Sequence, residues 1–156
     1  ISRTHRDLAD LSGAAISESV TSIDGPTALG SFESMPTLVE PRREPLPQTR
    51  SSVTHKFSIG GHEGYLTIGL FQDGQPGEIF IKMSKEGSTL SGLIQGFCRA
   101  FSLALQHGLS TTDAVERFRG MRFEPMGPTS NPEIPEASSI LDYVARYLEH
   151  HFVDKG

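Results

Sequence analysis

Apolar and polar residues alternate with a period of two in three short stretches of the chain, which predicts three β-strands. The stretches are residues 54–59, 65–71 and 78–83. Turn residues separate them, first Gly60-Gly61 and then the run Asp73-Gly74-Gln75-Pro76-Gly77. Glycine tolerates positive φ and proline fixes its own φ, so both segments favour tight turns. Three consecutive strands joined in this way predict an antiparallel meander.

The pattern changes to a helical period after Gly87-Ser88-Thr89 and predicts a helix over residues 90–107. Its apolar positions recur at spacings of four, three, four and four residues, at Leu90, Ile94, Phe97, Phe101 and Leu105. Gly108 is suited to a left-handed helix end. A second helix is predicted from Ser110 to about Arg119, where Ser110 and Asp113 form a variant of the capping box.

A third helix is predicted over residues 136–152, with Glu136 in its first turn, where a carboxylate suits the helix dipole. Its apolar stripe contains Ile140, Tyr143, Val144, Tyr147 and Leu148. Together these elements predict an α+β fold, in which an antiparallel sheet of three or more strands has its helices packed on one face.

The first 52 residues have a different composition and predict an arm or linker. They contain no Tyr and a single Phe, and half of the chain's ten prolines. Such a segment buries too little apolar surface to offset its chain entropy. Within it, Leu8, Leu11, Ile16 and Val20 could line a short docking helix over residues 7–20, and residues 42–47 favour an extended strap. The globular domain is then expected over residues 53–152, followed by a tail at 153–156.

Charge and cysteine content exclude several classes of protein. The 156 residues carry 14 Lys and Arg against 19 Asp and Glu, a net charge of −5, which disfavours a uniformly basic nucleic-acid binder. One cysteine excludes an internal disulfide framework and suits a reducing compartment such as the cytoplasm. No apolar run is long enough to span a bilayer, so no membrane partner is expected. Because the chain starts at Ile1, we expect a fragment or a processed chain.

A candidate phosphate or anion site lies at the start of the longest predicted helix. It comprises Lys82, Lys85, Gly87, Ser88 and Thr89. Free N–H groups and the helix dipole favour an anion there, and two lysines would add positive charge. The alternative interpretation is that Ser88 or Thr89 caps the helix and that the lysines are solvated. The spacing matches neither a Walker loop nor a dinucleotide fingerprint.

Histidine and cysteine positions offer weaker candidates. His55 and His62 flank the Gly60-Gly61 turn and could face one another, but neither has a nearby cysteine or a helical histidine partner, so no metal site is predicted. Cys98 lies in the middle of a predicted helix and is expected to be buried. It has no second thiol to resolve an oxidised form. The serines lie in no Gly-x-Ser-x-Gly motif, so no hydrolase nucleophile is predicted.

Long collinear runs of residues resemble a known family. They are Arg50–Phe57, Ile59–Tyr65, Asp73–Ile81, Lys85–Thr89, Ser102–Gln106, Arg122–Pro125, Asn131–Ile134 and Ser139–Tyr143. These runs resemble the C-terminal region of adenosylcobalamin-dependent ribonucleotide reductases, known as the TSCPD domain. This domain follows the catalytic barrel and also occurs as a separate small protein.

The resemblance implies a part in making deoxyribonucleotides. In the family the barrel carries the radical cysteine, the redox cysteine pair and the substrate and cobalamin sites, and this chain matches none of these. The resemblance therefore implies a non-catalytic accessory domain or small subunit, inactive alone, that contacts a catalytic subunit holding adenosylcobalamin. Self-association is a further possibility. The alternative hypothesis is a regulatory module that binds nucleotides or anions at the Ser88-Thr89 helix start.

Overall fold

A computed structural model of the chain describes Glu40 and residues 42–154. Three antiparallel strands form its main sheet in the order β1-β2-β3: β1 (Ser52–Ile59), β2 (His62–Leu70) and β3 (Pro76–Met83). The predicted meander is confirmed. Each strand begins two or three residues earlier than the apolar alternation indicates, because backbone pairing between strands does not depend on side-chain polarity and continues past the alternating residues.

The register places the apolar residues of all three strands on one face of the sheet. Leu66 lies between His55 of β1 and Ile81 of β3, and Ile68 pairs with Ile79. This face contributes Phe57, Ile59, Leu66, Ile68, Ile79, Ile81 and Met83 to the core. The opposite face bears Tyr65 and Phe80, both of which remain largely exposed. The alternation of side chains along each strand therefore separates a core face from an outer face.

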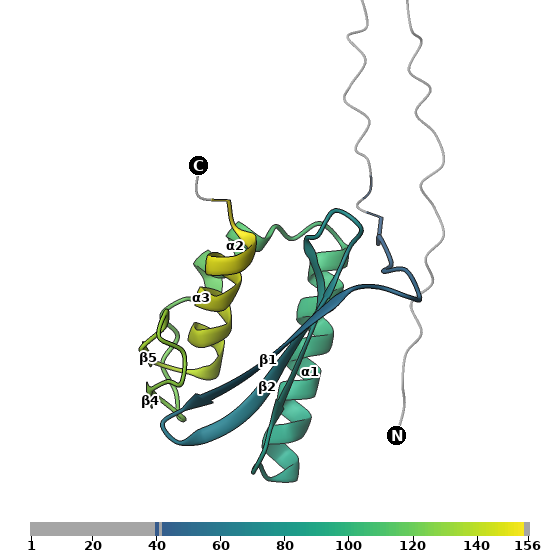
Figure 1. Ribbon diagram of the computed structural model, residues 1–156. Coiled ribbons are helices and arrows are strands. Elements are labelled where there is room, and N and C mark those ends of the chain that lie inside the picture. Colours follow the sequence, from purple (N-terminus) through teal and green to yellow (C-terminus); the bar gives the residue numbers. More distant parts are fainter. Residues whose placement is uncertain (1–39, 41, 155–156) are drawn as a thin grey trace, which may run out of the picture. The chain divides into compact units, whose positions relative to one another are not determined.

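Three helices accompany the sheet: α1 (Ser88–Gln106), α2 (Thr111–Phe118) and α3 (Ile140–Phe152). Gly108 has a φ of +102°, the left-handed conformation predicted for the residue that ends α1. The hydroxyl of Ser110 accepts a hydrogen bond from the N–H of Asp113, so the predicted cap of α2 is confirmed. α1 lies beside the sheet and contacts β3, and α2 contacts α3 (Figure 1).

The start of the third helix differs from the prediction. Glu136 lies not in its first turn but in a short strand, β5 (Glu136–Ala137), which pairs with β4 (Gly127–Pro128). The helix begins at Ile140, because the hydroxyl of Ser139 accepts the N–H of Asp142 and caps it. The predicted start at residue 136 was therefore wrong by four residues, since the backbone there pairs with a distant segment.

The core lies between the inner face of the sheet and the three helices. Tyr143 of α3 stacks on Phe57 of β1, with ring centroids 4.8 Å apart. Phe118 of α2 meets Phe97 and Phe101 of α1 in edge-on contacts at 5.4 and 5.5 Å. Offset and edge-on aromatic pairs of this kind add to the stabilisation from burial alone. The predicted packing of helices on one face of an antiparallel sheet is confirmed.

Residues 42–51 form a strap that lies against the domain before β1 begins. The N–H of Glu44 donates to the carbonyl of Gln106 at 2.8 Å, and Arg50 forms an ion pair with Glu78 at 2.6 Å. A Cβ added to Gly77 would lie 2.8 Å from side-chain atoms of Leu46 and Phe71, so glycine allows the close approach. The proposed docking helix over residues 7–20 lies outside the described residues.

Candidate functional site

The predicted anion-site residues surround the junction between β3 and α1. Lys82 extends from the outer face of β3, where it pairs with Tyr65 of β2. Lys85, Ser88 and Thr89 are exposed, and Gly87 is the N-cap residue of α1. The junction therefore gathers Lys85 with the helix start, whereas Lys82 belongs to the strand before it.

No side chain of the described residues caps the start of α1. Gly87 occupies the N-cap position and has no side chain with which to cap. The alternative that Ser88 or Thr89 caps the helix was therefore wrong. A cavity of about 290 Å³ beside the junction is lined by Lys85 but also by Glu63 and Glu86, whose carboxylates oppose an anion.

The structure separates the two histidines that flank the Gly60-Gly61 turn. His62 pairs with Ile59, whereas His55 pairs with Leu66 and faces the core side of the sheet. The expectation that they could face one another was wrong, because His55 lies four positions along the strand from Ile59, the residue that pairs with His62. Within residues 42–154, no three His, Cys, Asp or Glu side chains are grouped as a metal ion would require.

His55 instead belongs to a cluster of rings between β1 and α3. Its Nε2 lies 2.8 Å from the hydroxyl of Tyr143, which also accepts a hydrogen bond from Asn131 at 3.2 Å. Its ring stacks on Tyr147 at 4.4 Å. Burial lowers the pKa of His55, and the nearby His151 lowers it further. The sequence pattern did not predict this cluster, since His55 and Tyr143 lie 88 residues apart in the chain.

A ladder of polar side chains joins α1 to the free edge of β3. Ser102 Oγ accepts from the N–H of Ile79 at 3.0 Å, and Gln106 Nε2 donates to the carbonyl of Gly77 at 3.0 Å. The backbone of Ile81 makes the third contact, with Cys98. Burial raises the pKa of the Cys98 thiol, although the Ile81 hydrogen bond partly opposes this effect. The expected burial of Cys98 is confirmed.

The spacing of this edge ladder follows from helix and strand geometry. Cys98, Ser102 and Gln106 are four residues apart, so they rise about 6 Å per step along one stripe of the helix. Their partners, Ile81, Ile79 and Gly77, are two residues apart, a step of about 6.6 Å along a strand. The two repeats match closely enough for three successive contacts. The ladder satisfies backbone groups that an open sheet edge would leave unpaired.

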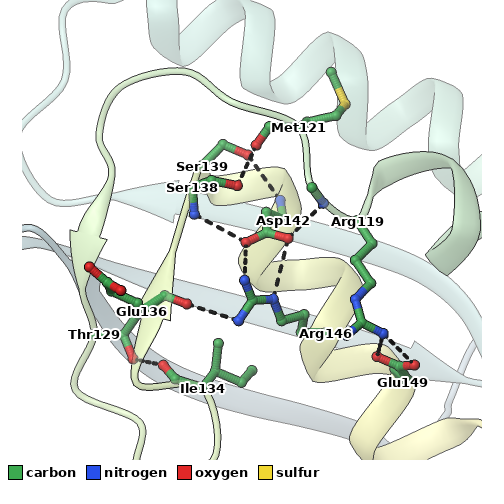
Figure 2. Close-up of polar contacts among 11 residues, drawn as sticks. Arg119, Met121, Thr129, Ile134, Glu136, Ser138, Ser139, Asp142, Arg146 and Glu149 are labelled. Atoms are coloured by element: carbon green, nitrogen blue, oxygen red, sulfur yellow. Dashed lines mark hydrogen bonds and ion pairs between the residues drawn. The ribbon is translucent and has the colours of Figure 1, made fainter.

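A second polar network holds the segment before α3 to the helix (Figure 2). The carboxylate of Asp142, which has no exposed surface, accepts from the N–H groups of Gly120 and Ser138 and from the guanidinium of Arg146. Burial alone would raise the pKa of Asp142, but these hydrogen bonds outweigh it and lower the pKa. The spacing of Ser139 and Asp142 was the sequence signal that could have located this network.

An open groove of about 480 Å³ lies between α1 and the outer face of the sheet. Phe80 and Ile81 line it from β3, and Gln95, Cys98, Arg99, Ser102, Leu103 and Gln106 line it from α1. Arg43 of the strap and Glu78 complete it. Two of its polar residues, Ser102 and Gln106, already form hydrogen bonds with the backbone of β3. The groove presents apolar surface flanked by arginines.

These features define a class of protein: a small α+β domain whose polar networks hold its own chain together, with an apolar groove on its surface. The TSCPD domain model matches residues 37–152, and the chain belongs to this family.

The similar proteins are named vitamin B12-dependent ribonucleotide reductases. The protein from Rhodopirellula baltica is 57% identical over 109 residues, which cover 70% of this chain and 10% of the relative. Those from Streptomyces avermitilis and Bradyrhizobium diazoefficiens are each 44% identical, over 113 and 119 residues. These matches cover 72% and 76% of this chain, but only 12% and 10% of the two relatives. No solved structure matched the chain.

None of the helices in the described part is long and apolar enough to cross a membrane. The chain spans about a tenth of the length of the R. baltica relative.

Proposed function

We propose that this chain is a non-catalytic accessory domain or small subunit of an adenosylcobalamin-dependent ribonucleoside-diphosphate reductase, which supports deoxyribonucleotide synthesis by contacting the catalytic part. The observation that carries the proposal is the match to about 10% of a vitamin B12-dependent ribonucleotide reductase at 57% identity. A segment so similar and so small is a component of that system. We place the cofactor in the catalytic part and the assembly in the cytoplasm.

The cysteine inventory supports a non-catalytic role. Thiol-dependent reduction of a substrate leaves a disulfide, which needs two cysteines. The chain has one, Cys98, and it is buried in the edge ladder with a raised pKa. A buried thiol with a raised pKa is a poor nucleophile, because the thiolate is the reactive form. Cys98 therefore serves packing.

The test uses the R. baltica reductase in three forms: intact, lacking the region that matches this chain, and with that region replaced by residues 37–152 of this chain. We expect ribonucleotide reduction to fall in the deleted form and to recover in the replacement enzyme. The isolated chain should show no turnover. Full activity of the deleted enzyme, or turnover by the isolated chain, would contradict the proposal.

The bare start of α1 supports a second candidate, a module that binds nucleotides or other anions through Lys85, Gly87, Ser88 and Thr89, with Lys82 nearby. No side chain of the described residues satisfies the first N–H groups of α1, which are the donors that a phosphate would use. Titration with ADP and ATP, followed by chemical shifts of the residue 85–89 amides, tests this function. Binding weaker than millimolar would remove it.

A further inference from the structure

Helix α1 has an unusual composition for a helix at the surface of a domain. Its 19 residues include a single charged side chain, Arg99. A helix that is apolar around most of its circumference is normally buried on most of its surface. Here only one side of α1 is covered by the described residues, because its buried residues are Cys98, Phe101, Leu105 and Gln106.

The uncovered side of α1 carries large apolar residues and glycines together. Leu93 is 67% exposed and Leu103 is 45% exposed, and Phe80 across the groove is 52% exposed. Between them, a Cβ added to Gly92 or Gly96 would meet nothing within 4 Å. Glycine inside a helix costs about 1 kcal/mol relative to alanine, and nothing in the described domain requires it at these two positions. The exposed leucine side chains on this side contribute no burial of apolar surface to the stability of the described domain.

The charges around the groove favour a partner that is not a second copy of this chain. Glu78 is the one carboxylate in its lining, and it is already bound to Arg50 at 2.6 Å. Arg43 binds the neutral amide of Gln106 at 2.8 Å, and Arg99 forms no ion pair within residues 42–154. The groove therefore presents two cations, Arg43 and Arg99, that form no ion pair within residues 42–154. A second copy docked groove to groove would bring two more cations, whereas a carboxylate would neutralise them.

We propose that the exposed side of α1 and the adjoining groove, defined by Phe80, Gly92, Leu93, Gly96, Arg99 and Leu103, form the surface on which a ribonucleotide reductase catalytic part docks. The docked segment is an apolar helix that carries a carboxylate facing Arg99. Small residues on α1 let the backbone of that helix approach closely, and the flanking leucines and Phe80 supply apolar area. This inference rests on the proposed function, since it names the contact surface of the same assembly.

Site-specific cross-linking in the replacement enzyme tests the surface. The photo-reactive residue p-benzoylphenylalanine is placed at Leu103 in the groove or, as the control, at Glu116 on the exposed surface of α2. We expect the position 103 probe to cross-link to an apolar helix outside the replaced region, and the position 116 probe not to do so. Cross-links between residues 103 of two copies of the chain would overturn the docking surface. A cross-linking yield at position 103 no higher than that at position 116 would also overturn it.

A substitution at Gly96 provides a second readout with effects of opposite sign. In the isolated chain, Gly96→Leu should raise the melting temperature, because leucine is a better helix former and has open space. In the replacement enzyme the same change should lower turnover about tenfold, the effect of losing about 1.4 kcal/mol at an interface. Glu116→Leu is the matched control and should leave turnover unchanged. Unchanged turnover in Gly96→Leu would overturn the surface.

The two proposals fail in distinguishable ways. If the replacement enzyme recovers activity but residue 103 gives no cross-link beyond its region, the accessory function stands and the docking surface is wrong. If the deleted enzyme is fully active, the accessory function is wrong whatever the probe reports. Arg99→Glu should weaken the cross-link about tenfold, and Arg99→Lys should retain it, because lysine keeps the positive charge that glutamate reverses.

Discussion

The hydroxyl of Ser102 and the backbone of Ile79 exchange two hydrogen bonds across the boundary between α1 and β3. Ser102 Oγ accepts from the Ile79 N–H at 3.0 Å and donates to the Ile79 carbonyl at 3.4 Å. One small side chain thus replaces the neighbouring strand that would otherwise pair with this residue. The sheet can end at β3 because α1 covers its edge.

Ser102→Ala should destabilise the domain by about 1–2 kcal/mol, because the N–H and carbonyl of Ile79 would lose their partner in a part-buried position. The measurement is the free energy of unfolding in urea. Thr112→Ala on the exposed surface of α2 is the control for helix propensity, and it should be neutral or slightly stabilising. Equal stability of the Ser102 variant and the wild type would show that the edge ladder contributes nothing.

Gln106→Leu should loosen the strap as well as the edge. Gln106 donates to the Gly77 carbonyl and accepts from Arg43 Nε at 2.8 Å, and leucine can do neither. We expect the amide of Glu44 to exchange with solvent at least about tenfold faster, which corresponds to about 1.4 kcal/mol less protection. Gln95→Leu, an exposed position on the same helix, is the control. Unchanged exchange at Glu44 would mean that the backbone bond alone holds the strap.

Asp142→Asn should destabilise the domain by about 2–4 kcal/mol, since a buried amide would present N–H groups to donors and Arg146 would lose its ion pair. The pKa of Asp142 is lowered in the folded state, so its contribution is present above the ordinary pKa of an aspartate and is lost as pH falls through the folded value. Urea unfolding measured from pH 7 down to about 3 should therefore show a stability loss.

The Asp142→Asn variant isolates the contribution of the Asp142 carboxylate to the pH dependence of stability. Its stability should fall less steeply with acid than that of the wild type, because position 142 no longer titrates. Arg119→Gln is the matched control, since it removes the exposed ion pair with Glu149 and should cost no more than about 1 kcal/mol. Parallel pH profiles for the wild type and Asp142→Asn would contradict the assignment.

His55→Phe should remove a pH-dependent contribution to stability. The pKa of His55 is lowered in the fold, so the unfolded chain binds the proton more readily. Stability should therefore fall as pH drops from about 6.5, the ordinary histidine value, and level off below the folded pKa. Thermal unfolding between pH 7.5 and 5 is the measurement, and the phenylalanine variant should show a shallower profile.

Tyr143→Phe separates burial from hydrogen bonding in the same cluster. It removes the hydroxyl at 2.8 Å from His55 but keeps the ring packed on Phe57. Because burial is the first cause of the lowered His55 pKa, the pH profile should keep its slope while stability falls at every pH by about 1 kcal/mol. A flat profile in this variant would assign the shift to the hydroxyl instead.

The starts of the helices are the feature that the local sequence pattern predicted least well. The stripe from Ile140 to Leu148 predicts a helix, and the helix is present. Its start was placed four residues early because Glu136 suits a first turn, while the pairing of Glu136 with Pro128 was not visible in local pattern. Gly87 shows the same limit, since the neighbouring serine and threonine predict a side-chain cap that the structure does not have.

The order of the three main strands and three helices, much of the core and the family resemblance could be obtained from the amino-acid sequence, because periods of 2 and 3.6 are local properties of each element. The short strands β4 and β5 could not. The three-way contact of Cys98, Ser102 and Gln106 with β3, the burial of Asp142 and the His55 cluster depend on which elements become neighbours. Tertiary packing alone decides that, since the groups that meet lie in different elements, as with Ser102 and Ile79, 23 residues apart, and His55 and Tyr143, 88 residues apart.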